Sequence, residues 1–153
     1  GAERLALHGV HAIVAHSLGA LAVTRAVSRT VTPKRVVFIA PPTAPLWPER
    51  FAAKLGLDAQ VAAATRTAIE RSSGIQVASL DPRTVASDMK APLLVVHDRG
   101  DREVPFAEGE SLVEVWPNAE LLATEGLGHH KILRSPEVGE AVLRFLKPLQ
   151  RGR

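Results

Sequence analysis

The sequence has no cysteine among its 153 residues, which excludes disulfide bonds and metal sites built on thiolates. This absence fits a reducing compartment, and we expect a cytoplasmic protein. No apolar run approaches the length of a membrane span, and no secretory signal peptide is recognisable. Only 4% of the residues are aromatic, and the basic residues are scattered rather than arranged in a stripe with them. We therefore expect neither a nucleic-acid-binding nor a membrane protein.

The chain has enough apolar residues to build a core. Its hydrophobic fraction of 46% suits one compact domain over residues 1–153. The first residue is Gly1 rather than methionine, so we expect a processed or trimmed chain, or a piece of a longer one.

The segment from Val10 to Leu21 is the most informative part of the sequence. An apolar run is followed by a His-Ser-Leu-Gly turn and then by the start of an amphipathic helix. This order predicts a strand, a sharp turn with Ser17 at its tip, and a helix, and it points the Leu18 amide into the same space as the Ser17 hydroxyl. Ala15 and Gly19 are small enough to allow so tight a turn. The alternative interpretation is that Ser17 only caps the helix.

Short apolar segments alternate with helical patterns along the rest of the chain. Strands are expected at residues 11–16, 35–40, 92–97 and 119–124. Residues 2–8 are expected to be the end of a helix that Gly9 closes, and further helices are expected at 18–29, 106–116 and 136–146. This alternation predicts an α/β fold, a parallel sheet of about four strands flanked by helices.

Residues 43–90 form an insertion that is longer than a simple crossover between strands needs. It is expected to hold a short helix that carries Trp47, Phe51 and Leu55, and two further helices over about 59–72, capped by Asp58, and 82–89. Its length suggests a helical cap over a site, although an elaborated crossover without a ligand role remains an alternative.

Reactive side chains follow the ends of three expected strands. Ser17 follows the first strand, Asp98 and Asp101 follow the third, and His129 and His130 follow the fourth. In a parallel sheet with right-handed crossovers these ends share one edge, where ligands bind. A serine hydroxyl needs an imidazole to take its proton and a carboxylate to orient that imidazole. The three residue types together are the minimum set for acyl transfer.

The order of serine, aspartate and histidine, with the serine on a strand-to-helix turn, resembles the α/β-hydrolase superfamily. The loop after the third strand resembles the acid-bearing loop of that family, in which the carboxylate shortly precedes a Val-Pro pair, and this selects Asp101. The Gly-Leu-Gly-His sequence ending at His129 resembles the family's histidine loop. Asp98 stays as a reserve acid and His130 as a reserve base, and Asp101 has the alternative role of a turn residue.

The resemblance covers only the C-terminal half of the family's fold, including the helical cap insertion. Family members place several strands before the serine turn, so strand 11–16 would here be an exposed edge. We therefore expect as partner either a missing N-terminal segment or a second copy paired through strand 11–16. The family also takes one oxyanion donor from the absent half, which leaves the Leu18 amide.

The resemblance implies a serine hydrolase that acts on carboxylic esters, with Ser17 as nucleophile, His129 as base and Asp101 as orienting acid. Trp47, Phe51 and Leu55 are expected to line the acyl side under the cap. No cofactor is needed. His8, His11 and His16 are too irregularly spaced for a metal site, and no carboxylate is placed beside them. We expect His16 and His97 to be buried and hydrogen-bonded. The alternatives are a non-catalytic binding module and an acyltransferase or thioesterase of the same fold.

Overall fold

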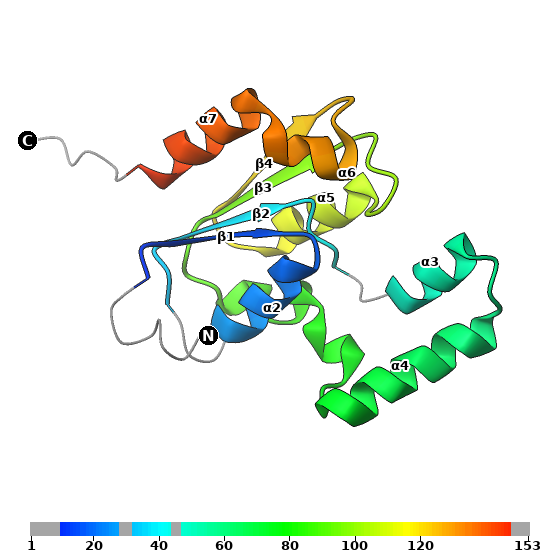
Figure 1. Cartoon of the computed structure of the whole chain (residues 1–153). Helices are drawn as coiled ribbons and strands as arrows, with labels where there is room; N and C mark the ends of the chain where they lie inside the picture. Colours follow the sequence, from blue (N-terminus) through cyan, green and yellow to red (C-terminus); the bar gives the residue numbers. More distant parts are fainter. Residues whose placement is uncertain (1–9, 28–31, 44–46, 148–153) are drawn as a thin grey trace, which may run out of the picture.

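The computed structural model describes residues 10–27, 32–43 and 47–147, and within these ranges four parallel strands form one sheet (Figure 1). The strands lie in the order in which they follow along the chain, and they are β1 (Ala12–His16), β2 (Arg35–Ile39), β3 (Leu93–Asp98) and β4 (Ala119–Thr124). The predicted parallel sheet is confirmed, with strand ends that differ from the expected ones by at most one residue. The expected helix over residues 2–8 lies outside the described residues.

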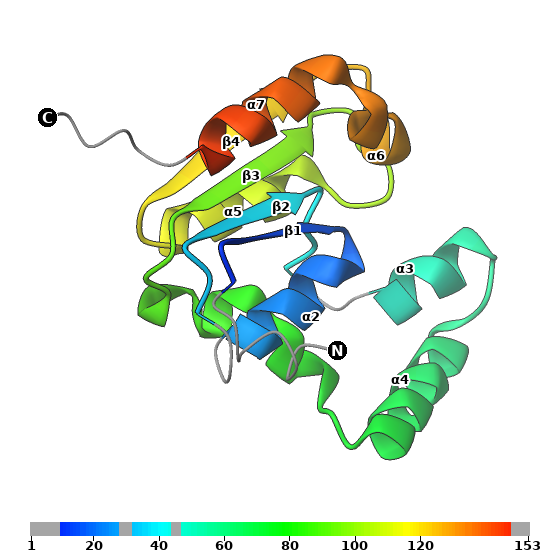
Figure 2. The ribbon, with the colours of Figure 1, turned by 60° about the vertical axis from the view of Figure 1, so that its left-hand side comes forward.

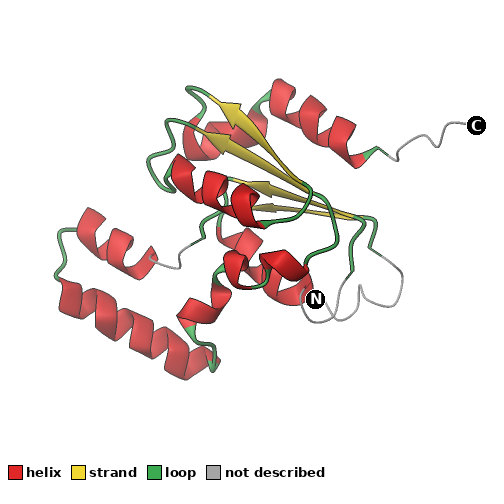
Figure 3. Cartoon of the chain, turned by 180° about the vertical axis from the view of Figure 1, so that it is seen from behind, coloured by secondary structure: helices red, strands yellow, loops and turns green. Residues whose placement is uncertain are grey.

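Helices cover both faces of the sheet. α2 (Leu18–Val27) and α5 (Phe106–Val115) pack on one face, where their side chains meet Val36, Phe38 and Val95. α7 (Pro136–Leu146) packs on the other face against Val37 and Val96. In Figure 3 α5 lies in front of the sheet and α7 behind it. Because β2 and β3 are covered on both sides, their sequences are apolar at nearly every position.

The insertion between β2 and β3 begins with two helices that pack against each other and project from the sheet (Figure 2). They are α3 (Trp47–Lys54) and α4 (Ala59–Ser73). As expected, Asp58 caps α4, since its side chain accepts a hydrogen bond from the Val61 amide at 3.0 Å, and Gly74 ends the helix with a φ of 67°. Arg66 of α4 donates hydrogen bonds to Glu49 of α3 and so joins the two helices.

The helix expected over about 82–89 is wrong. The chain forms three short 3₁₀ turns instead, η2 (Val77–Leu80), η3 (Pro82–Thr84) and η4 (Ala86–Asp88). Asp81 and Val85 lie between them with non-helical backbone angles, and the Asp81 side chain accepts from the Arg83 amide and starts a new turn. Ala86 and Met89 are buried in the core from these turns.

None of the helices within the described ranges is long and apolar enough to cross a membrane.

Candidate active site

Ser17 occupies the turn between β1 and α2 with a left-handed backbone conformation, at a φ of 51°. Such a conformation is costly for a residue other than glycine, and here it is fixed from both sides. The Ser17 amide donates to the Ile39 carbonyl at 2.9 Å, and its own carbonyl accepts from the Ala20 amide at 2.9 Å. A Cβ placed on Gly19 would touch the Cβ of Ala15 at 3.7 Å, so larger side chains at these two positions would push α2 away from β1.

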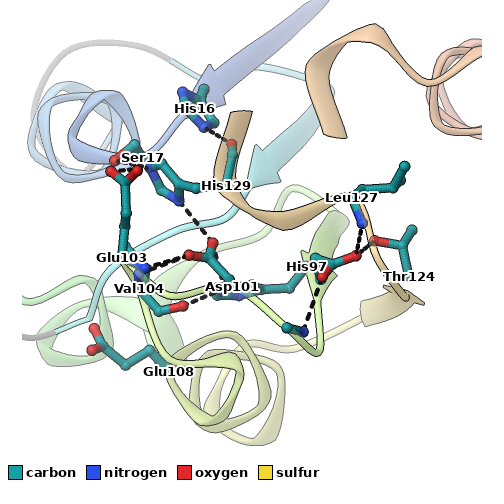
Figure 4. Close-up of polar contacts among 12 residues, drawn as sticks. His16, Ser17, His97, Asp101, Glu103, Val104, Glu108, Thr124, Leu127 and His129 are labelled. Carbon is teal, nitrogen blue, oxygen red and sulfur yellow. Dashed lines mark hydrogen bonds and ion pairs between the residues drawn. The ribbon is translucent and has the colours of Figure 1, made fainter. Parts of the chain in front are cut away.

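His129 lies between Ser17 and Asp101 (Figure 4). Its Nε2 is 3.0 Å from Ser17 Oγ, and its Nδ1 is 2.7 Å from Asp101 Oδ2. The ring stands on α6 (Gly128–Lys131), a short helix after β4 that Gly126 and Gly128 introduce with φ values of 77° and 61°. The structure thus brings together the three residues that the sequence selected. The Ser17 hydroxyl bonds to this imidazole, which goes beyond a helix-capping role.

The Asp101 carboxylate is fully buried and held by three donors. Burial alone would raise its pKa, but hydrogen bonds from the Val104 amide, the His129 ring and the Glu103 amide outweigh burial and hold the pKa of Asp101 below its usual range. Asp101 therefore both shapes its loop and contacts His129. It does not cap α5, whose N-cap is Pro105.

These bonds decide where the protons lie. An ionised Asp101 only accepts hydrogen bonds, so His129 Nδ1 must carry the proton and donate it. Nε2 of a neutral ring then has a free lone pair, and the Ser17 hydroxyl donates to it. The imidazole is oriented to remove a proton from Ser17.

Asp98, the reserve acid, points elsewhere and joins three segments. One carboxylate oxygen accepts from the Gly100 amide at 2.9 Å, and the other from Thr124 Oγ1 at 2.8 Å and the Leu127 amide at 3.0 Å. Burial raises the pKa of Asp98, but these hydrogen bonds outweigh burial, and the pKa lies below its ordinary value. Asp98 thus ties the end of β3 to the loop that carries His129.

The remaining histidines have structural partners. His130, the reserve base, has a side chain that is 73% exposed, and its Nε2 lies 2.9 Å from Glu103. His16 Nε2 donates to the His129 carbonyl at 3.0 Å, and His97 Nε2 to the Val104 carbonyl at 3.1 Å. Burial lowers the pKa of both His16 and His97 despite these bonds and so favours the neutral form of each ring. The expected hydrogen bonds of both histidines are confirmed, and His97 is buried as expected, but the prediction that His16 is buried is wrong, since it is only partly buried.

Ser17 and His129 line a pocket of about 610 Å³. α3 contributes Arg50, Ala53 and Lys54 to its wall, and the loop after β3 contributes residues 102–105. Leu55 was expected in this wall but follows the end of α3, is 57% exposed and does not line the pocket. The side chains of Trp47 and Phe51 lie outside the described part of the structure.

The polar residues of this wall were not selected from the sequence. Glu103 Oε2 lies 4.0 Å from His129 Nε2. Arg50 forms an ion pair with Glu108 of α5, and Glu108 also accepts from the Thr43 amide at 2.7 Å. The position of Glu103 and Arg102 directly after Asp101 was the available signal. The described residues contain no group of three or more side chains that would hold a metal ion.

The Leu18 amide stands next to Ser17 at the start of α2. The first amides of a helix have no partner within it and carry the positive end of the helix dipole. The Leu18 side chain, 49% exposed, lines the same pocket. The amide is thus available to a negatively charged oxygen bound beside Ser17.

A family model described as TAP-like protein, one of the α/β-hydrolase families, matches residues 59–151. This range includes Asp101 and His129 and does not reach Ser17. No curated protein matches the sequence significantly.

Solved α/β-hydrolase structures share the fold. The meta-cleavage product hydrolase from Pseudomonas fluorescens aligns with a TM-score of 0.62 and 17% identity over 92% of this chain and 65% of its own. The esterase domain of a Rhodothermus marinus protein aligns with a TM-score of 0.62 and 18% identity, over 90% of this chain and 61% of its own. A bromoperoxidase from Bacillus anthracis aligns with a TM-score of 0.62 and 19% identity, over 93% of this chain and 69% of its own. The chain thus spans less than two thirds of the hydrolase and of the esterase domain.

Proposed function

The chain belongs to the TAP-like protein family of α/β-hydrolases, and from this premise we propose that it is a serine hydrolase of carboxylic esters. The observation that carries the proposal is the continuous contact from Ser17 Oγ to His129 at 3.0 Å and from His129 to Asp101 at 2.7 Å. Three unlike residues, distant in the sequence, meet in the order that proton transfer requires. The neighbouring hydrolase and esterase structures agree with a hydrolytic role.

In the first half of the reaction Ser17 Oγ attacks the ester carbonyl carbon while its proton passes to His129 Nε2. The charge that develops on the carbonyl oxygen is stabilised by the Leu18 amide. The resulting imidazolium is stabilised by the ionised Asp101. When the carbon–oxygen bond to the alcohol breaks, the leaving alcohol takes the proton from His129, and the acyl group stays on Ser17.

In the second half a water molecule attacks the acyl carbon, and His129 Nε2 takes a proton from it. The bond to Ser17 then breaks, Ser17 Oγ recovers the proton, and the carboxylic acid leaves. The family resemblance implies a second oxyanion donor from a segment before residue 10. Loss of one such donor costs on the order of 10²–10³ in rate, so we expect low activity from this chain alone.

A fluorophosphonate tests the proposal, because it reacts only with an activated serine. We expect an adduct on Ser17, located by mass spectrometry of the digested protein, and loss of labelling in Ser17→Ala and His129→Ala. His130→Ala is the matched control, since this neighbouring histidine is exposed and contacts Glu103, whereas it is His129 that contacts Ser17. Absence of an adduct on Ser17, or labelling that survives His129→Ala but not His130→Ala, would overturn the assignment.

A further inference from the structure

The pocket beside Ser17 holds cationic side chains that ester hydrolysis itself does not use. Lys54 of α3 and Arg102 of the loop after β3 both line it. Neither side chain has an ion-pair partner among the residues that the structure describes. Arg50, which lines the same wall, is already paired with Glu108. Two cations of this pocket are therefore available to a ligand.

Lys54 faces the pocket because of its position on α3. Arg50, Ala53 and Lys54 are spaced so that they lie on one face of a helix, and all three line the pocket. The ion pair between Arg50 and Glu108 fixes this face toward α5 and the site. Lys54 is thus presented to the pocket by the same contact that anchors the helix.

The charge in the pocket is unevenly placed. Glu103 holds its carboxylate next to the histidines, 2.9 Å from His130 Nε2 and 4.0 Å from His129 Nε2. A second negative charge near His129 would be repelled by Glu103, whereas one near Lys54 would be attracted. Much of the remaining wall is apolar and is formed by Leu18, Pro42, Ala53 and Val104. The pocket therefore has a carboxylate beside the histidines and, among the described residues, an unpaired cation on α3.

From this arrangement we infer that the substrate is an ester that carries a carboxylate on an apolar stem, and that the positive charges of Lys54 and Arg102 attract this carboxylate. The inference rests on the proposed ester hydrolysis and names its substrate class. A volume of about 610 Å³ accommodates a stem of several methylene groups. The carboxylate belongs to either the acyl or the alcohol part, and the two sources are separated by experiment.

Two ester pairs test the inference on the full chain. Mono-4-nitrophenyl adipate and 4-nitrophenyl hexanoate differ only in a terminal carboxylate on the acyl part. The 4-carboxyphenyl and 4-carbamoylphenyl esters of hexanoic acid place the same contrast in the alcohol part. One partly exposed ion pair changes binding by up to about five-fold, so two cations give a preference of about ten-fold in kcat/KM for the acidic ester of one pair. The preference shrinks as salt concentration rises.

The double variant Lys54→Gln/Arg102→Gln is expected to bring the acidic-to-neutral ratio of kcat/KM close to one. Arg144→Gln/Lys147→Gln is the matched control, because it also removes one arginine and one lysine, at the end of α7 and outside this pocket. The control keeps the ratio of the unmodified chain. Equal kcat/KM within both ester pairs, or an equal loss in the control, overturns the inference while ester hydrolysis stands.

Binding to Ser17→Ala separates this inference from the proposed function, because this variant needs no turnover. Monomethyl adipate and methyl hexanoate are titrated, and the NMR shifts of the Leu18 and Ala53 amides give the two dissociation constants. We expect about ten-fold tighter binding of monomethyl adipate, lost in the additional Lys54→Gln/Arg102→Gln background. That result without cleavage of any ester refutes the hydrolase and retains the acidic-ligand site. Equal dissociation constants refute the acidic-ligand site.

Discussion

Asp98 and Asp101 follow one another closely at the end of β3, and neither carboxylate is exposed. Their partners differ in kind. One oxygen of Asp101 accepts a hydrogen bond from the ring of His129. Asp98 accepts hydrogen bonds from two backbone amides and from the hydroxyl of Thr124. The same residue type should therefore give two different phenotypes when it is changed.

At Asp101 we expect a loss of activity without a comparable loss of stability. In Asp101→Asn an amide replaces the carboxylate beside His129, so the ring no longer has an acceptor that fixes the proton on Nδ1. The fluorophosphonate labelling rate of Ser17 should fall on the order of 10⁴-fold. Labelling within ten-fold of the unmodified chain would exclude Asp101 as the orienting acid.

At Asp98 we expect a loss of stability. In Asp98→Asn one oxygen becomes a donor and confronts an amide or hydroxyl that also donates, which lowers the free energy of unfolding by about 2–4 kcal/mol. This change in the free energy of unfolding is measured by urea denaturation. The control Asp88→Asn changes an exposed aspartate of η4 and should stay within about 0.5 kcal/mol. A stable Asp98→Asn with slow labelling would reverse the two assignments.

His97 should make stability depend on pH. Burial lowers its pKa in the folded chain below 6.5, despite the hydrogen bond to the Val104 carbonyl and Asp101 Oδ2 at 3.5 Å. The unfolded chain then binds more protons, so stability is fully present above about pH 6.5 and falls as the pH is lowered.

Between pH 6.5 and 5.5 the loss due to His97 is up to about 1 kcal/mol. In His97→Gln this part of the slope should vanish, while the smaller contribution from His16, whose pKa is also lowered, remains. Urea denaturation at several pH values measures both slopes. Identical slopes in the two proteins would show that folding does not lower the pKa of His97.

At the scale of elements, we expect substitution by alanine to change stability in opposite directions at two glycines, one in α5 and one in α7. A Cβ on Gly109 of α5 would lie 2.5 Å from His97 Nδ1 and 3.2 Å from Val95 Cγ1, both in the core. Gly109→Ala should therefore lower the free energy of unfolding by about 1–3 kcal/mol. A Cβ on Gly139 of α7 meets nothing within 4 Å, and Gly139→Ala should raise it by about 0.5–1 kcal/mol. Thermal or urea denaturation giving the same sign for both would contradict the described packing of α5.

The elements that were predicted correctly are those with local signals. Continuous apolar runs marked the buried strands, and Asp58 and Gly74 marked the two ends of α4. The segment from Pro82 to Met89 carries a similar start signal at Asp81, but it forms two separate turns, η3 and η4, with a break at Val85. Val85 is neither glycine nor proline, so the sequence carries no such local signal for this break.

The residues of the site also divide into those that the sequence predicted and those that it did not. Ser17, Asp101 and His129 were selected because each follows a strand end, and parallel strands bring their ends to one edge. Lys54 was not selected, since no pattern in the sequence shows that Arg50 of α3 pairs with Glu108 of α5, whereas Arg102 was missed despite its position directly after Asp101. Leu55 was misplaced because, one residue past the end of α3, the chain turns its side chain to solvent.

At the scale of the whole molecule, β1 is the least protected part of the sheet. Among the residues that the structure describes, β1 pairs with β2 alone, and Val14, on the face opposite α2, is 49% exposed. An edge strand offers unpaired amides and carbonyls to another strand, and an exposed apolar residue adds to that attraction. β1 lacks the charged residues, prolines and bulges that shield such edges in other proteins.

We therefore predict that this chain self-associates through β1. The mass from light scattering should exceed 16.4 kDa and rise with concentration. Val14→Lys puts a charge on the exposed face of the edge strand and should shift the protein toward monomer, because bringing two such lysines together is unfavourable. Val61→Lys is the matched control, as it changes a valine that is 42% exposed on α4, which projects away from the sheet, and it should leave the mass unchanged (Figure 2). A monomer at all concentrations would show that this edge does not attract a second copy, whereas equal dissociation by both lysines would place the contact elsewhere.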